Sequence, residues 1–170
     1  MSTRSIITFK LGDEILQVYK HWDGYPETTV PELQEFLKWN GHRNDQLDYT
    51  MANYCYWYKN RHFKDQMESH WKAHTDSEVE NFVKSHNSSE HTGLGICHGK
   101  PMMNYSEATE EYNAEYFYIV DLVENRIYEE ASSQYWDFTH ETPKKYMGYV
   151  LEYRSIDWRR KNCSRSLILD

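Results

Sequence analysis

The chain has 170 residues, of which 39% are hydrophobic and 27% charged, so its composition is that of a globular protein and excludes a disordered one. This length suffices for one hydrophobic core, and we expect residues 1–170 to form a single domain. The formal net charge of −8 repels polyanions, which argues against general electrostatic binding to nucleic acids or anionic membranes.

The first predicted element is a β-hairpin. Residues 5–11 and 15–21 are rich in β-branched and aromatic side chains, and Gly12-Asp13 between them is typical of a two-residue hairpin turn. Antiparallel pairing of these strands would bring Arg4 level with the end of the second strand.

A helix is predicted soon after the hairpin. Thr29 has the pattern of an N-cap, with Pro31 in the first turn and Glu32 at the capping-box position. Gly41 is typical of the residue that ends a helix.

Two further helices are indicated by apolar residues at spacings of three and four. The first covers residues 45–73, with a bend expected near residues 60–62 because its apolar stripe shifts there. The second covers residues 77–86.

The rest of the chain favours strands. We expect them at residues 94–98, 115–123, 126–130 and 146–156. Residues 115–123 are apolar on both faces, which predicts a central strand. Residues 99–113 are expected to form a polar connection or flap, and residues 132–144 an irregular segment. The element order predicts an α+β fold, with an antiparallel sheet of about five to six strands and helices packed on one face.

The candidate binding site lies where the second strand ends. Arg4 and His21 would bind an anionic group, Trp22 and Tyr25 would stack on a planar ring, and Asp23 would accept from a hydroxyl or amine. A structural alternative stands beside each assignment. Arg4 and Asp23 would form an ordinary ion pair, Trp22 would belong to the core, and His21 would be a satisfied structural histidine.

Other chemistry finds little support. The three cysteines are odd in number and widely spaced, which argues against a disulfide framework, and no signal peptide or apolar membrane span is present, so we expect a cytoplasmic protein. His70 and His74 have metal-ligand spacing but lack the glutamate of the zinc-protease motif, and Cys97 and His98 would point to opposite faces of a strand. We therefore predict no metal and no cofactor.

The residues at the candidate site also resemble a known group. Ser2-Thr3-Arg4 and the motif His21-x-Asp23-Gly24-Tyr25-Pro26, together with residues 115–121, resemble a family of small uncharacterised microbial and phage proteins that carry both motifs. The resemblance implies that these residues belong to the family pattern, and it implies no activity. Residues 49–72 and the basic tail at 157–166 lie outside that pattern.

These observations favour a binding protein for a small anionic, nucleotide-like ligand, which in a phage would sequester a host nucleotide signal. Two alternatives remain. One is an acidic protein-interaction or nucleic-acid-mimic module that uses the 15 tyrosines of the chain, and the other is a hydrolase in which Asp23 orients His21 as an acid or base. The expected partners are the ligand and, beyond it, a host protein or a second copy in a homodimer, without direct contact to nucleic acid or membrane.

Overall fold

The computed structural model describes residues 2–71, 75–85, 93–140 and 142–146. These residues form an α+β fold in which four α-helices and one 3-10 helix surround a single sheet of seven strands. In chain order the elements are β1 (Ser5–Leu11), β2 (Glu14–Lys20), α1 (Pro26–Asn40), η1 (Gly41–Asp45), α2 (Leu47–Trp71), α3 (Asp76–Ser85), β3 (Leu94–Ile96), α4 (Tyr105–Tyr112), β4 (Tyr116–Asp121), β5 (Arg126–Glu129), β6 (Gln134–Asp137) and β7 (Lys144–Lys145).

The sheet is mixed, in the strand order β3-β2-β1-β4-β5-β6-β7. β1 and β4 pair in parallel, whereas every other neighbouring pair is antiparallel. The predicted α+β class is confirmed, and the predicted antiparallel sheet of about five to six strands is only roughly consistent with this mixed sheet of seven. A parallel pair needs a long crossover, and here the helices between β1 and β4 provide it.

The predicted hairpin is confirmed. Ser5 pairs with Lys20 at one end and Leu11 with Glu14 at the other, and Gly12 takes a positive φ of 64° in the turn between them. The next residues beyond the Ser5–Lys20 pair are Arg4 and His21. The hairpin register thus brings the candidate arginine and histidine to the same end of the sheet.

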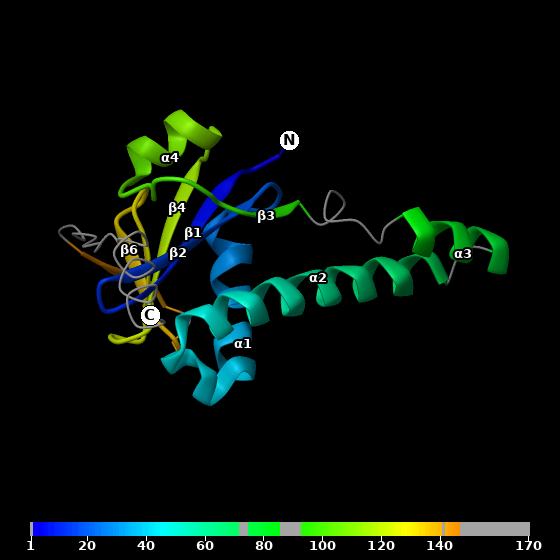
Figure 1. Ribbon diagram of the computed structural model, residues 1–170, viewed down its shortest axis with the longest axis horizontal. Coiled ribbons are helices and arrows are strands. Elements are labelled where there is room, and N and C mark those ends of the chain that lie inside the picture. The colour runs from blue at the N-terminus through cyan, green and yellow to red at the C-terminus, as the bar shows by residue number, and fades with distance from the viewer. Residues whose placement is uncertain (1, 72–74, 86–92, 141, 147–170) are drawn as a thin grey trace, which may run out of the picture.

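Helices cover both faces of the sheet, not one as predicted (Figure 1). On the first face α1 and α2 pack against the strands, through apolar side chains such as Phe36 and Tyr54 that contact Phe9. On the second face Ala108 of α4 belongs to a separate cluster with Phe117 and other strand residues. The C-terminal half of α2 extends away from the sheet, with α3 near its end (Figure 1).

The start of α1 differs from the predicted N-cap at Thr29. The helix begins at Pro26, whose fixed φ suits a first helical residue, and Tyr25 is its N-cap. The Thr29 hydroxyl instead donates to the Asp23 carbonyl at 3.1 Å and accepts from Lys20 Nζ at 3.1 Å. Gly41 ends the helix with a φ of 57°, as predicted.

Other boundaries were partly wrong. α2 continues as one helix through residues 60–62, where a bend was expected. The expected flap contains α4, capped by the Asn104 side chain, which accepts from the Glu107 amide. The expected irregular segment contains β6 and the first residue of β7. Apart from Tyr146, the strand predicted at residues 146–156 lies outside the described residues, as does the basic tail.

No helix in the described ranges has the length and apolar character that crossing a membrane requires.

Candidate functional site

Arg4, Tyr19 and His21 form a polar cluster at the open end of the first hairpin. The Tyr19 hydroxyl lies 2.5 Å from Nδ1 of His21, and Arg4 is close enough for its charge to act on the same hydroxyl. Burial raises the pKa of Tyr19, and the charge of Arg4 offsets part of that rise. All three side chains are partly buried, so they are ordered by the fold and still reach solvent.

Which of the two groups donates in the Tyr19–His21 contact depends on the tautomer of His21. The Arg4 guanidinium, in contrast, has only donors. The cluster therefore presents the Arg4 guanidinium and the His21 imidazole from the same end of the sheet.

Trp22 adds an exposed aromatic ring beside this cluster. The indole is 41% exposed, which is unusual for such a large apolar side chain, and its centroid lies 4.9 Å from the His21 ring in an edge-on arrangement. The backbone of Gly93 runs against the indole and accepts a hydrogen bond of 2.8 Å from the His21 amide. A Cβ at position 93 would lie 2.5 Å from the indole, so only glycine fits there.

Tyr112 and Cys97 line the protein side of the cluster. The Tyr19 and Tyr112 rings lie 5.2 Å apart, and Cys97 and Tyr112 are close enough for each to affect the pKa of the other. Burial raises the pKa of Cys97 to about 11, so its thiol stays protonated at neutral pH. Sequence reasoning missed Tyr112 because α4 was not predicted.

The structure separates Asp23 and Tyr25 from Arg4 and His21. Asp23 has a positive φ of 52°, and its carboxylate accepts from the Tyr25 hydroxyl at 3.5 Å. The charge of Asp23 acts on Lys20, which lies on the first face of the sheet, whereas Tyr19 packs on the second face. No ion pair between described residues joins Arg4 to Asp23, so the expected Arg4–Asp23 pair is wrong.

A buried ionic network that sequence reasoning did not identify anchors this strand end to the helices. Lys20 is 0% exposed, and its Nζ lies 2.6 Å from Oε2 of Glu32 in α1. The other oxygen of Glu32 lies 3.5 Å from Nε2 of His62 in α2, and the His62 ring packs on Tyr58 at 4.2 Å. The network links β2, α1 and α2, and it holds the loop that follows Lys20 in a defined place.

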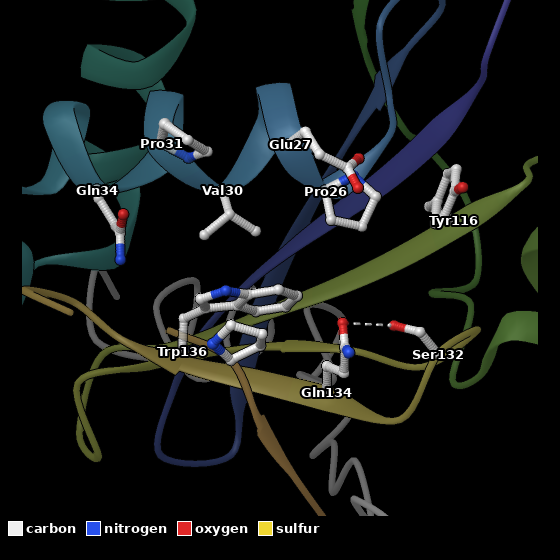
Figure 2. Close-up of a pocket in the computed structure, with 10 residues that line it drawn as sticks. Pro26, Glu27, Val30, Pro31, Gln34, Tyr116, Ser132, Gln134 and Trp136 are labelled. Carbon is white, nitrogen blue, oxygen red and sulfur yellow. Dashed lines mark hydrogen bonds between the residues drawn. The ribbon is translucent and has the colours of Figure 1, made fainter. Parts of the chain in front are cut away.

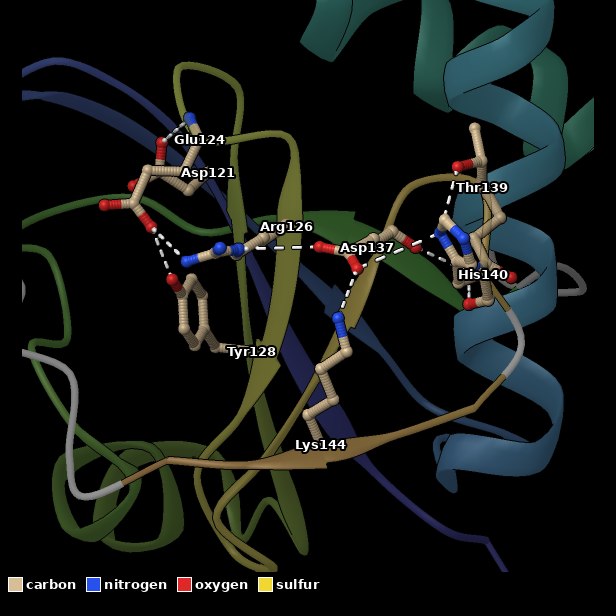
Figure 3. Close-up of polar contacts among 9 residues, drawn as sticks. Asp121, Glu124, Arg126, Tyr128, Asp137, Thr139, His140 and Lys144 are labelled. Carbon is tan, nitrogen blue, oxygen red and sulfur yellow. Dashed lines mark hydrogen bonds and ion pairs between the residues drawn. The ribbon is translucent and has the colours of Figure 1, made fainter.

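A second ionic cluster lies at the opposite side of the sheet, around Asp137 (Figure 3). Its carboxylate lies 2.9 Å from Nζ of Lys144, 3.5 Å from Nε of Arg126 and 3.8 Å from Nδ1 of His140. Hydrogen bonding to Lys144 lowers the pKa of Asp137. These exposed pairs connect β5, β6 and β7, and each cation already has an acidic partner.

No metal-binding group of three or more His, Cys, Asp or Glu side chains is found among the residues that the structure describes. The side chains of His70 and His74 lie outside that part of the chain.

Comparison of the chain with family models, curated proteins and solved structures finds no match in any of the three. The site is therefore interpreted from its own geometry.

Proposed function

We propose that the protein binds a small anionic, nucleotide-like ligand at the end of the first hairpin, with Arg4 and His21 holding the anionic group. One observation carries the proposal. Arg4 is partly buried, and none of the described carboxylates forms an ion pair with it, although acidic residues outnumber basic ones by 27 to 19 in the chain. A guanidinium that no carboxylate occupies is available to bind a phosphate or carboxylate with two parallel hydrogen bonds.

The neighbouring residues suit the rest of such a ligand. The His21 imidazole is a second polar group for the anion, and the exposed Trp22 indole offers a stacking surface for a planar base. Asp23 and Tyr25 lie toward the other face of the sheet, so we do not include them among the residues that contact the ligand. The proposed ligand contacts are Arg4, His21 and Trp22, and Tyr19 is a positioning residue.

Calorimetric titration of nucleoside monophosphates and cyclic nucleotides tests this proposal. We expect at least one of them to bind, and Arg4→Gln to weaken that binding about 10- to 100-fold through the loss of charged hydrogen bonds. Arg43→Gln is the matched control, because Arg43 lies on η1, where its guanidinium bonds Gln46 and stacks on Tyr49. The proposal fails if no nucleotide binds, or if Arg4→Gln binds it as tightly as the wild type.

The hydrolase alternative has less support. A hydrolase of this kind needs Asp23 to orient His21, whereas Nδ1 of His21 contacts the Tyr19 hydroxyl instead. The Cys97 thiol is protonated at neutral pH, so it does not offer a thiolate nucleophile either. Analysis of the titrated nucleotides for product separates the two functions, because a sequestering protein returns its ligand unchanged.

An interaction module is the second candidate, favoured by exposed aromatic side chains on the helices. Trp39 is 53% exposed and Tyr56 is 63% exposed. If this function is correct, replacing both with serine will abolish retention of a host protein and leave nucleotide titrations unchanged.

A further inference from the structure

A groove separates the N-terminal half of α1 from β6, on the face of the sheet opposite Tyr19 and His21 (Figure 2). Its volume is about 870 Å³, within the range of small-molecule sites. The close-up shows Val30 of α1 pointing toward the indole of Trp136, with Tyr116 of β4 at one end (Figure 2). Val30 and Trp136 are buried in one core cluster, so they form the floor of the groove, and the more exposed Pro31 and Tyr116 belong to its rim. An apolar floor of this kind suits a flat ring.

The walls are fixed at one end by Gln34 of α1. Its amide donates to the Asp137 carbonyl at 3.0 Å and to the His140 carbonyl at 2.7 Å, which ties the helix to the segment after β6. The distance between the two walls is thus set by hydrogen bonds that are present without a ligand. A preformed site loses less conformational entropy when a ligand binds.

The other end of the groove is fixed by Glu129. This buried carboxylate accepts from the amides of Ala131 and Ser132, at 2.7 and 2.8 Å, and from the Ser132 hydroxyl. Those bonds hold the turn before β6, so Ser132 and Gln134 keep their place on the lower wall.

The charge of the groove selects against anions. Among the described residues that line it, Glu27 is the only charged one, and none of them is a lysine, arginine or histidine. Burial raises the pKa of the lining residue Tyr116, and the carboxylates of Glu129, Glu27 and Glu115 raise it further. The Tyr116 end of the groove is therefore negative, and aromatic rings next to it favour a cation.

We propose that this groove is a second binding site, which takes a small organic cation with a planar ring. The ring lies over the buried floor of Val30 and Trp136, and the cationic group faces Glu27 at the Tyr116 end. This site is independent of the anion site proposed above, because its ligand has the opposite charge and no residue is shared.

Three probes of equal shape and different charge test the proposal. Benzamidine is a planar cation, benzamide its neutral counterpart and benzoate its anionic one. By ligand-observed NMR titration we expect benzamidine to bind with a Kd of about 1 mM or tighter, as expected for a fragment of this size. Benzamide should bind more weakly and benzoate least.

The Glu27→Gln variant distinguishes benzamidine binding in this groove from nonspecific attraction of a cation to an acidic protein. The variant is expected to lower benzamidine affinity about fivefold, to the level of benzamide, and to leave benzamide unaffected. Glu110→Gln on α4 removes an equally exposed carboxylate from the other face and should change nothing. The proposal is overturned if benzamidine shows no saturable binding, if the three probes bind alike, or if both variants lower its affinity equally.

Discussion

Gly24 shows how closely the chain packs at the residue scale. Its amide donates to the Thr3 carbonyl at 2.8 Å, and its carbonyl accepts from the Tyr118 hydroxyl at 2.7 Å. A Cβ at this position would lie 2.6 Å from the Thr3 carbonyl oxygen and 2.9 Å from the Ser5 side chain. The glycine of the His-x-Asp-Gly-Tyr-Pro motif is thus required by backbone packing.

Gly24→Ala is therefore expected to destabilise the fold by about 1–3 kcal/mol, because rigid backbone must move to admit the methyl group. Chemical denaturation measures the loss in free energy of unfolding. Gly95→Ala in β3 is the matched control, since a Cβ there meets nothing within 4 Å, and its effect should stay within about 1 kcal/mol. Equal losses in both variants would contradict this explanation.

The ion pair of Lys20 and Glu32 belongs to the scale of elements, because it joins β2 to α1. Both groups are buried, and removing one partner of a buried pair leaves the other charge without compensation. The Glu35–Arg61 pair joins α1 to α2 at the surface, where solvent weakens it. The two pairs share α1 and differ in burial.

We expect Glu32→Gln to cost about 3 kcal/mol or more in free energy of unfolding, and Glu35→Gln less than about 1 kcal/mol. Replacing both buried charges, with Lys20→Met and Glu32→Leu together, should recover most of the loss because no charge stays unpaired. Urea denaturation of the three variants gives these values. A Glu32→Gln variant as stable as Glu35→Gln would show that the buried pair does not anchor β2.

Some elements could be predicted from the sequence and others could not. The difference depends on how far apart in the sequence the interacting residues lie. The hairpin at Gly12-Asp13 depends on local turn chemistry, so its register could be predicted, and with it the meeting of Arg4 and His21. The parallel pairing of β1 with β4 joins segments about a hundred residues apart, and no local pattern encodes it.

Two missed elements did carry a local signal. Asn104 and Glu107 form the capping interaction of α4, and Asn113 ends that helix with a φ of 52°. Residues 99–113 were nevertheless predicted to form a connection, because their composition is polar. The role of Tyr19 was missed for another reason. Which side chain bonds His21 depends on which face of β2 each residue occupies, and Asp23 lies beyond the end of that strand.

Tyrosine burial dominates the pH dependence of the whole molecule above neutrality. Burial raises the pKa of Tyr54, Tyr58 and Tyr118 well above the ordinary value of 10.0, whereas burial lowers that of Lys20 from 10.5. In alkaline solution the unfolded chain loses tyrosine protons that the folded chain keeps, so stability falls as pH rises. The lowered pKa of Lys20 has the opposite effect on stability, but Lys20 is a single group, whereas three tyrosines lower the stability.

We therefore expect the free energy of unfolding to be lower at about pH 11 than at about pH 8. Urea denaturation at both values measures it, with tyrosinate absorbance as a second signal that should rise mainly when the protein unfolds. Full tyrosine ionisation in the folded protein near pH 10 would contradict the prediction.

The acid side of the profile depends on Glu32. Burial alone would raise its pKa, but the neighbouring His62 imidazole and the charge of Lys20 outweigh burial and lower it from 4.5. Its contribution to stability is complete above pH 4.5 and is lost as the pH falls through the lowered value. The stability of Glu32→Gln should consequently vary less than that of the wild type between about pH 5 and about pH 2. The prediction would be contradicted if the free energy of unfolding fell equally in the two proteins over this pH range.

The NMR signals of the His21 imidazole test the proposed anion site most directly. They can be assigned by their absence in His21→Gln, with His42 on η1 as an internal reference. We predict that a nucleoside monophosphate that binds in the calorimetric titrations shifts the His21 signals saturably, that the matching nucleoside without phosphate does not, and that His42 is unaffected. A bound monophosphate that leaves His21 unchanged, or one that shifts His21 equally in Arg4→Gln, would contradict the site.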